Sequence, residues 1–179
     1  MEQKPMDQVE EKVDKVMESD AMKTKIGKLS IGQYLTYNKR ALMVTLVIII
    51  VLGVLSLIPV IGWFFWWIYS VAFWLCTLYI TFMIGYKLAK DKRQEIKEAL
   101  IGGAVLGGVY GIIHAVITLL ATIMTVFVFT TALGVSFAVG ATVFSMIWII
   151  VGNIIGGLIV ALIGFAVAGG FNKEATDAK

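Results

Sequence analysis

Residues 99–129 read ALIGGAVLGGVYGIIHAVITLLATIMTVFVF, and residues 135–170 read VSFAVGATVFSMIWIIVGNIIGGLIVALIGFAVAGG. With the residues between them they form a run of seventy-two residues that has no Asp, Glu, Lys or Arg and that holds the chain's one histidine. Such a run would be insoluble in water, whereas about 20 apolar residues suffice for a helix to cross a bilayer. The run therefore predicts an integral membrane protein.

Two long or tilted helices, at about 99–129 and 135–171, fit this run, with a turn near residues 130–134. Three crossings would also fit its length. They would send Lys173 and Lys179 to the side of the membrane opposite the other cations, so two crossings are expected.

The preceding residues predict two more spans. The chain has 179 residues, of which 59% are hydrophobic and 15% are charged. Runs of aliphatic and aromatic residues indicate spans at about 41–58 and 63–86, and Pro59 between them cannot continue a helix. The expected fold is all-α and polytopic: a head at 1–40, a bundle of four transmembrane helices over 41–171, and a tail at 172–179.

Positive charge sets the expected orientation. All fifteen Lys and Arg residues lie in residues 1–40, in the loop 87–98, or after Phe171. Cytoplasmic loops of multi-pass proteins carry an excess of Lys and Arg. We therefore expect the head, the loop and both termini in the cytoplasm, and the spans in the cell (inner or plasma) membrane.

The head has two parts of different composition. Residues 1–20 are acidic and carry a narrow apolar stripe, which predicts a cytoplasmic amphipathic helix. The residues that follow mix Lys and Arg with aliphatic and tyrosine side chains, which predicts contact with the lipid headgroups and attraction to anionic lipid. Nucleic acid is not needed to explain these cations, and no nucleic-acid partner is expected. The residues predicted to contact the membrane surface are Lys23, Lys25, Lys28, Lys39 and Arg40.

Small residues recur at every fourth position in both helices of the uncharged run. Where side chains are absent, two backbones approach closely, and in lipid this packing replaces the hydrophobic drive that water would supply. Because the two helices run antiparallel, the glycines of one are expected to face those of the other. The predicted helix-packing seam consists of Gly103, Gly107, Gly111, Gly152 and Gly156.

His114 and Asn153 are expected to form a polar pair across this seam. Counted from the cytoplasmic ends of their helices, both lie about 20–26 Å deep at 1.5 Å per residue. An unpaired polar side chain in hydrocarbon costs a few kcal/mol, so each needs a partner. An interhelical hydrogen bond is the preferred interpretation, ahead of a polar lining for a path. A catalytic or metal role is disfavoured, because no second His, no Cys and no carboxylate lies at ligand spacing.

Hydroxyl side chains continue the same helix faces toward the outer surface. They would line a path if the seam opened to water. These residues are Thr118, Thr122, Thr125, Thr142 and Ser145.

Two classes of function remain open. The chain has no P-loop, HExxH motif or CxxC pair, and no charged residue lies inside a span, so no enzyme, cofactor or ion-coupled transporter is expected. The preferred prediction is a non-enzymatic membrane component: an accessory or structural subunit that packs against other membrane subunits, or a small homo-oligomer. The alternative is a passive channel or facilitator for a small neutral solute, with a path lined by Thr and His between the third and fourth spans.

Overall fold

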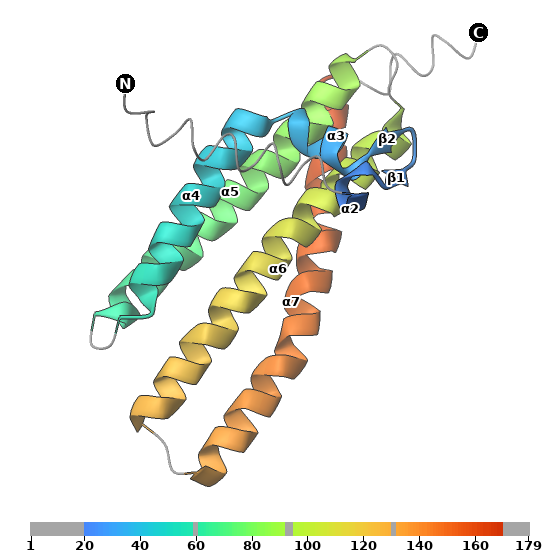
Figure 1. Cartoon of the computed structure of the whole chain (residues 1–179). Coiled ribbons are helices and arrows are strands. Elements are labelled where there is room, and N and C mark those ends of the chain that lie inside the picture. Colours follow the sequence, from blue (N-terminus) through green and yellow to red (C-terminus); the bar gives the residue numbers. More distant parts are fainter. Residues whose placement is uncertain (1–19, 59–60, 92–94, 130–131, 170–179) are drawn as a thin grey trace, which may run out of the picture.

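The computed structural model describes residues 20–58, 61–91, 95–129 and 132–169 (Figure 1). Each of its four long helices is long and apolar enough to cross a membrane. The prediction of a helical protein with four helices able to span a membrane is therefore confirmed, and the uncharged run forms two helices rather than three. The four are α4 (Lys39–Ser56), α5 (Gly62–Lys90), α6 (Ile96–Phe129) and α7 (Ala132–Val167).

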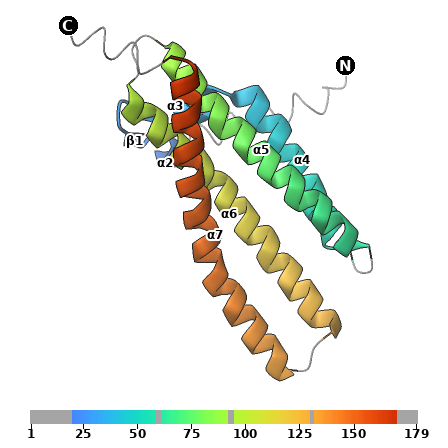
Figure 2. The ribbon, with the colours of Figure 1, turned by 180° about the vertical axis from the view of Figure 1, so that it is seen from behind.

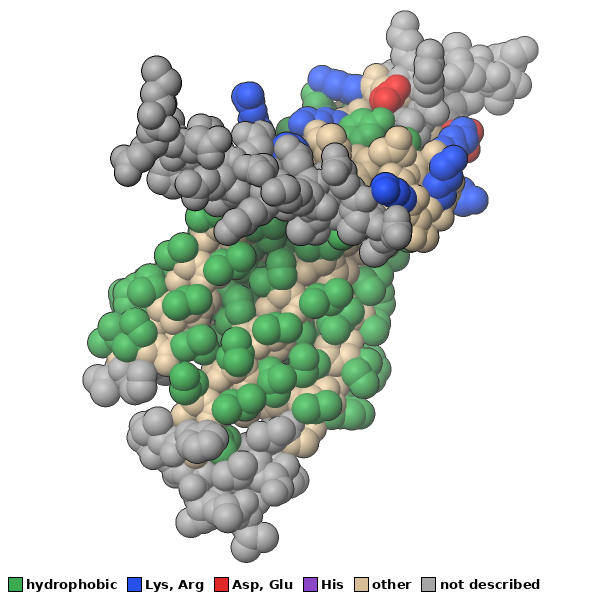
Figure 3. Space-filling view, viewed as in Figure 1, with side chains coloured by type: hydrophobic (Ala, Val, Ile, Leu, Met, Phe, Trp, Pro, Cys, Tyr) green, Lys and Arg blue, Asp and Glu red, His purple; other side chains and the backbone are tan. Residues whose placement is uncertain are grey.

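The long helices form two antiparallel hairpins, α4 with α5 and α6 with α7 (Figures 1 and 2). The described Lys, Arg, Asp and Glu side chains gather at one end of the bundle (Figure 3). We call this the charged end. Helices α4 and α6 end, and α5 and α7 begin, at the other end, which we call the uncharged end (Figure 1).

The α6–α7 hairpin extends further than the α4–α5 hairpin at the uncharged end (Figure 1). Helix α6 has 34 residues and α4 has 18, which correspond to about 51 and 27 Å at 1.5 Å per residue. A hydrogen bond joins Tyr69 of α5 to His114 of α6. Because Tyr69 lies two turns from the start of α5, the last two turns of α6 project past the α4–α5 turn.

A short segment, residues 24–37, lies across the charged end, and we call it the strap. Its two strands pair antiparallel around Gly27, whose φ of 80° lies in the left-handed region. Ser30 begins the following helix through a capping box with Gln33. The expectation of an all-α fold misses this small hairpin, because strands of two residues carry no recognisable period. Its elements are β1 (Lys25–Ile26), β2 (Leu29–Ser30) and α3 (Ile31–Thr36), preceded by α2 (Asp20–Lys23).

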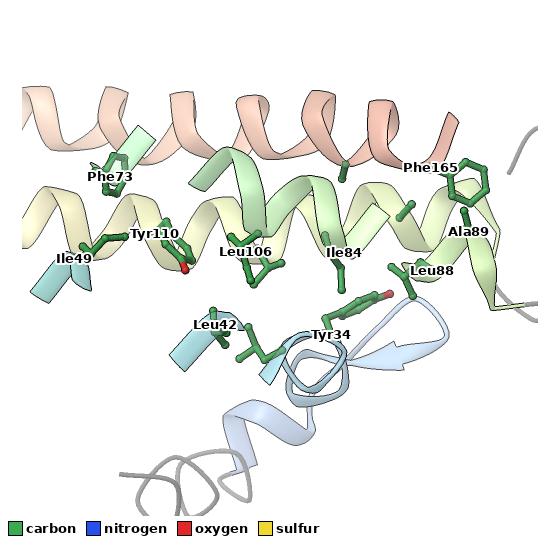
Figure 4. Packing of buried hydrophobic residues seen from close by; sticks show 14 of the residues in the cluster. Tyr34, Leu42, Ile49, Phe73, Ile84, Leu88, Ala89, Leu106, Tyr110 and Phe165 are labelled. Carbon is green, nitrogen blue, oxygen red and sulfur yellow. The ribbon is translucent and has the colours of Figure 1, made fainter. Parts of the chain in front are cut away.

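Buried apolar side chains from the strap and from all four long helices form one continuous core (Figure 4). It runs from Tyr34 of the strap, beside Ile84 and Leu88 of α5, to Phe73 and Ile49 nearer the uncharged end. The outward faces of the spans are apolar as well (Figure 3). An apolar exterior over the length of the helices is the surface that a lipid environment requires.

Two predicted segments lie outside the described residues. The expected amphipathic helix covers residues 1–20, of which only Asp20 is described, and the tail at 172–179 is not described. Both stay predictions.

Candidate functional site

Three of the predicted glycines lie where α6 and α7 meet backbone to backbone. A Cβ atom added at Gly103 would overlap the carbonyl oxygen of Gly157, and one added at Gly107 would overlap that of Asn153. A Cβ atom at Gly111 would lie 3.0 Å from the Cα atom of Ile150. Since the obstacles are backbone atoms, a larger residue would force the two helices apart.

The prediction is wrong for the other two glycines of the seam. A Cβ atom at Gly152 or Gly156 would meet no heavy atom within 4 Å. Gly157 takes their place, because a Cβ atom there would overlap the carbonyl oxygen of Gly103. Consecutive residues of a helix point about 100° apart. The adjacent glycines 156 and 157 therefore face different directions, and spacing alone does not tell which one faces α6.

Helix α7 also contacts α5, and the spacing of small residues does not predict this contact. A Cβ atom at Gly85 of α5 would overlap the carbonyl oxygen of Ala161, and one at Gly164 of α7 would overlap that of Phe82. The charged-end half of α7 is therefore held closely against both α5 and α6. Gly85 stands alone among large residues, so no repeat announces it as a contact position.

His114 is not paired with Asn153. Its Nδ1 atom lies 2.8 Å from the hydroxyl oxygen of Tyr69 on α5, and its ring stacks on that of Phe73 with centroids 4.3 Å apart. Helix α6 presents His114 and Tyr110 to α5 and α4, on the face next to its glycines. Residues three or four positions apart lie on the same side of a helix. The sequence spacing alone therefore does not separate the face with His114 and Tyr110 from the adjacent glycine face.

Asn153 faces the glycines of α6 instead. Its Nδ2 atom donates to the carbonyl oxygen of Ile149, at 2.8 Å, while its Oδ1 atom is buried and has no hydrogen-bond partner. The contact with Gly107 puts Asn153 seven residues, or about 10 Å, nearer the charged end than His114. The prediction of equal depth is wrong because it takes residues 99 and 171 as level, whereas the contact of Gly103 with Gly157 makes residue 99 level with about residue 161 of α7.

The hydroxyl residues mostly bond to their own helices. Thr122 donates to the carbonyl oxygen of Thr118, Thr125 to that of Ala121, and Ser145 to that of Thr142. One hydrogen bond of 3.2 Å crosses the seam, from Thr142 Oγ1 to Thr122 Oγ1. The Thr118 hydroxyl oxygen is buried and has no hydrogen-bond partner.

These hydroxyls lie near or beyond the α4–α5 turn. Thr118 is four residues past His114, and Thr122 and Thr125 are further along α6. On simple helix arithmetic Thr122 and Thr125 reach the part of α6 that projects past the α4–α5 turn. At the level of Thr118 helix α4 still lies beside α6, because a Cβ atom at Gly53 would overlap the side chain of Ile117. The structure thus places the hydroxyls toward one end of the seam rather than along the middle of a four-helix bundle.

The five predicted surface cations lie at the charged end, and one of them, Lys28, forms an ion pair with an acidic side chain of the protein. Lys28 Nζ lies 2.5 Å from Glu95 Oε1. This hydrogen-bonded ion pair raises the pKa of Lys28 and lowers the pKa of Glu95. The side chains of Lys23, Lys25 and Arg40 are exposed, and that of Lys39 is half-buried.

A buried carboxylate that no sequence pattern indicates joins the strap to α6. Glu98, in the first turn of α6, has a relative exposure of 1%. Its Oε1 atom accepts from the Lys28 backbone N–H at 3.0 Å, and its Oε2 atom accepts from the Tyr34 hydroxyl. Burial, then the hydrogen bond to Glu98, raises the pKa of Tyr34. In the sequence, Glu98 looks like one more charge of the loop 87–98.

The strap is joined to α5 as well. The Tyr37 hydroxyl donates to Asp91 Oδ2 at 2.8 Å, and Lys87 Nζ donates to the Tyr37 carbonyl oxygen at 2.9 Å. The aromatic ring of Tyr34 fits beside Gly102, where a Cβ atom would lie 2.9 Å from Ile84 Cγ1 and 3.2 Å from Tyr34 Cδ1. The strap therefore contacts the end of α5 and the start of α6 together.

Within the described part of the chain, no group of three or more His, Cys, Asp or Glu side chains is placed to hold a metal ion. Four helices that are long and apolar enough to cross a membrane indicate the class, a multi-pass α-helical membrane protein. The last of the four is in close backbone contact with α5 and α6. No family model matches the chain, and neither a curated protein nor a solved structure matches it.

Proposed function

We propose that this chain is a non-enzymatic component of the cell (inner or plasma) membrane, with both termini in the cytoplasm. It acts as an accessory or structural subunit of a membrane assembly, or as a small homo-oligomer. Its partners are other membrane subunits or further copies of the chain, together with anionic lipid at the charged end.

The observation that carries this proposal is the closed contact between α6 and α7. At Gly103 and Gly107 the two backbones leave no space even for one added carbon atom. Three of the hydroxyls expected to line a path donate to carbonyl oxygens of their own helices. Contacts of this kind favour a packed structural element over an aqueous path.

Exposed cations support the proposed lipid contact. Lys23, Lys25 and Arg40 are exposed at the end of the bundle where the apolar exterior stops (Figure 3). Basic side chains at such a boundary gain about 1 kcal/mol each near an anionic leaflet. Lys28 is a weaker candidate, because Glu95 already neutralises it.

One observation favours the alternative, a passive facilitator for a small neutral solute. The Thr118 Oγ1 and Asn153 Oδ1 atoms are buried in the α6–α7 region without hydrogen-bond partners. Buried polar atoms of this kind often hold a water molecule, and a series of such waters would form a path.

Solute flux separates the two functions. We expect liposomes that hold the purified protein to release urea and glycerol no faster than empty liposomes do. We expect His114→Leu and Thr122→Val to leave that rate unchanged. Release above the empty-liposome rate that either substitution abolishes, while Thr125→Val keeps it, would establish the facilitator and contradict the proposal.

Association in mild detergent tests the structural role itself. Native mass measurement of the protein extracted from its own membrane should give a complex with another membrane protein or a defined oligomer. A single species of one chain with no bound protein, over a range of mild detergents, would contradict both forms of the proposal.

A further inference from the structure

The strap is a small unit that is closed by its own hydrogen bonds. The two strands pair with each other, the Ile31 N–H donates to the Thr24 carbonyl oxygen at 3.1 Å, and Ser30 and Gln33 form the capping box. These interactions do not involve the four spans. The strap therefore keeps most of its own backbone bonds whether or not it is docked on them.

Its polar attachment to α6 converges on Glu98. One carboxylate oxygen accepts from the backbone of the strap's turn, at Lys28, and the other accepts from Tyr34 in α3. The turn is shaped to this carboxylate, because a Cβ atom at Gly27 would lie 2.8 Å from Glu98 Oε2. A single side chain of α6 thus holds two separate parts of the strap.

Burial makes this attachment depend on the charge of Glu98. A buried carboxylate is tolerated when donors satisfy it, and a position in the first turn of a helix favours its negative charge. When the strap lifts, Glu98 is solvated by water at little cost. When the strap is closed without that charge, the two donors lose a strong acceptor. The exposed Lys28–Glu95 ion pair contributes much less to holding the strap on α6 than the Glu98 hydrogen bonds do, because water screens it.

The close contacts among α5, α6 and α7 are formed by other residues. The glycines at 85, 103, 107, 157 and 164 face helix backbone and none of them touches the strap. We propose that the strap, residues 24–37, is a latch across the charged ends of α5 and α6, that the Glu98 carboxylate closes it, and that it opens while the glycine-packed spans stay folded.

Hydrogen exchange of the full-length protein in detergent micelles tests this proposal. Glu98→Gln keeps the shape of the side chain and removes its charge, and Glu95→Gln is the matched control at the exposed ion pair. We expect Glu98→Gln to speed amide exchange in residues 25–31 at least about tenfold, with residues 103–115 unchanged. Glu95→Gln should change exchange in residues 25–31 by less than about threefold.

Several results would overturn the latch. Unchanged exchange in residues 25–31 of Glu98→Gln would show that Glu98 does not hold the strap closed. An equal effect of Glu95→Gln would assign closure to the ion pair. Equal acceleration in residues 25–31 and 103–115, or a Glu98→Gln chain that does not fold, would show that the strap and the spans are inseparable. Tyr34→Phe keeps the ring and removes a hydroxyl that bonds both to Glu98 and, inside the strap, to the Ile26 carbonyl oxygen. It should speed exchange in the strap a few-fold, and no change would also count against the proposal.

Discussion

At the scale of single residues, the polar side chains inside the spans could be found from the sequence, but their partners could not. His114 and Asn153 stand out because they interrupt an apolar run, and both have to satisfy polar atoms. The hydrogen-bond partner of each side chain depends on which neighbouring helix its own helix face contacts. His114 bonds to Tyr69 of α5, while Asn153 bonds to its own helix.

The Tyr69–His114 hydrogen bond should show strong coupling. His114→Leu leaves the fully buried hydroxyl of Tyr69 without its partner, and we expect a loss of about 1–3 kcal/mol in the free energy of unfolding. Adding Tyr69→Phe should restore part of this loss, because the orphaned hydroxyl is then gone. A double-mutant cycle by unfolding in detergent measures the coupling, and additive effects of the two substitutions would refute it.

The ionisation of Tyr34 should report the closed strap. Burial raises the pKa of Tyr34 above its ordinary value of 10.0. Because the pKa is raised in the folded state, the contribution of Tyr34 to stability is full below about pH 10, where the unfolded tyrosine also keeps its proton. This contribution is lost as the pH rises toward the folded-state pKa. Tyrosine absorbance titrations of the wild type and Tyr34→Phe give the curve of Tyr34 by difference. A difference curve centred at the ordinary value would contradict this assignment.

At the scale of elements, the first two helices were predictable because their apolar runs are bounded by charge or by Pro59. The last two were predictable from the length of the uncharged run and from the position of the cations on either side of it. The end of the last helix was not predicted correctly. Helix α7 ends at Val167 rather than near residue 171, and Gly169 follows it with a φ of 77°. A glycine in the left-handed region is a common helix stop. Reading Gly169 as that stop would have removed about four of the ten residues by which the predicted register of the seam is off.

The hydrogen bond from Thr142 of α7 to Thr122 of α6 should make a small, measurable contribution to the free energy of unfolding. Thr142→Val removes the hydrogen bond to Thr122 and should cost about 0.5–1 kcal/mol of the free energy of unfolding. Thr125→Val is the control, because Thr125 bonds to its own helix and is exposed. Reversible unfolding of both variants in the same detergent makes the comparison, and a larger loss for Thr125→Val would reverse the assignment.

At the scale of the whole molecule, charge segregation predicted the number of long apolar helices and the gathering of the described charges at one end of the bundle. The arrangement of the helices around α7 was beyond the sequence. The contact of α7 with α5 depends on Gly85, which is set among large residues, and on Gly164, which the recurring small residues of α7 do not distinguish from glycines that meet open space. The strap depends on Glu98, whose burial nothing in its sequence neighbourhood indicates. Both follow from tertiary packing that no local pattern encodes.

The proposed orientation in the membrane is open to a direct labelling experiment. In a Cys76→Ser background, we expect a cysteine at Lys25 or Lys90 to resist a membrane-impermeant thiol reagent added outside intact cells. A cysteine at Ile61, which lies next to the α4–α5 turn, should react. Outside labelling at Lys25 together with protection at Ile61 would place the charged end outside.

The central claim is that backbone contact through one particular set of glycines holds α7 in place, and adjacent residues of α7 test it most directly. The measurement is the free energy of unfolding in bicelles for Gly157→Ala and Gly156→Ala. We expect Gly157→Ala to lose about 2 kcal/mol or more, because its methyl group would overlap the Gly103 backbone. Gly156→Ala should be unchanged or gain up to about 1 kcal/mol, since its methyl group meets open space and alanine favours the helix. Equal effects of the two substitutions, or a greater loss for Gly156→Ala, would contradict the account.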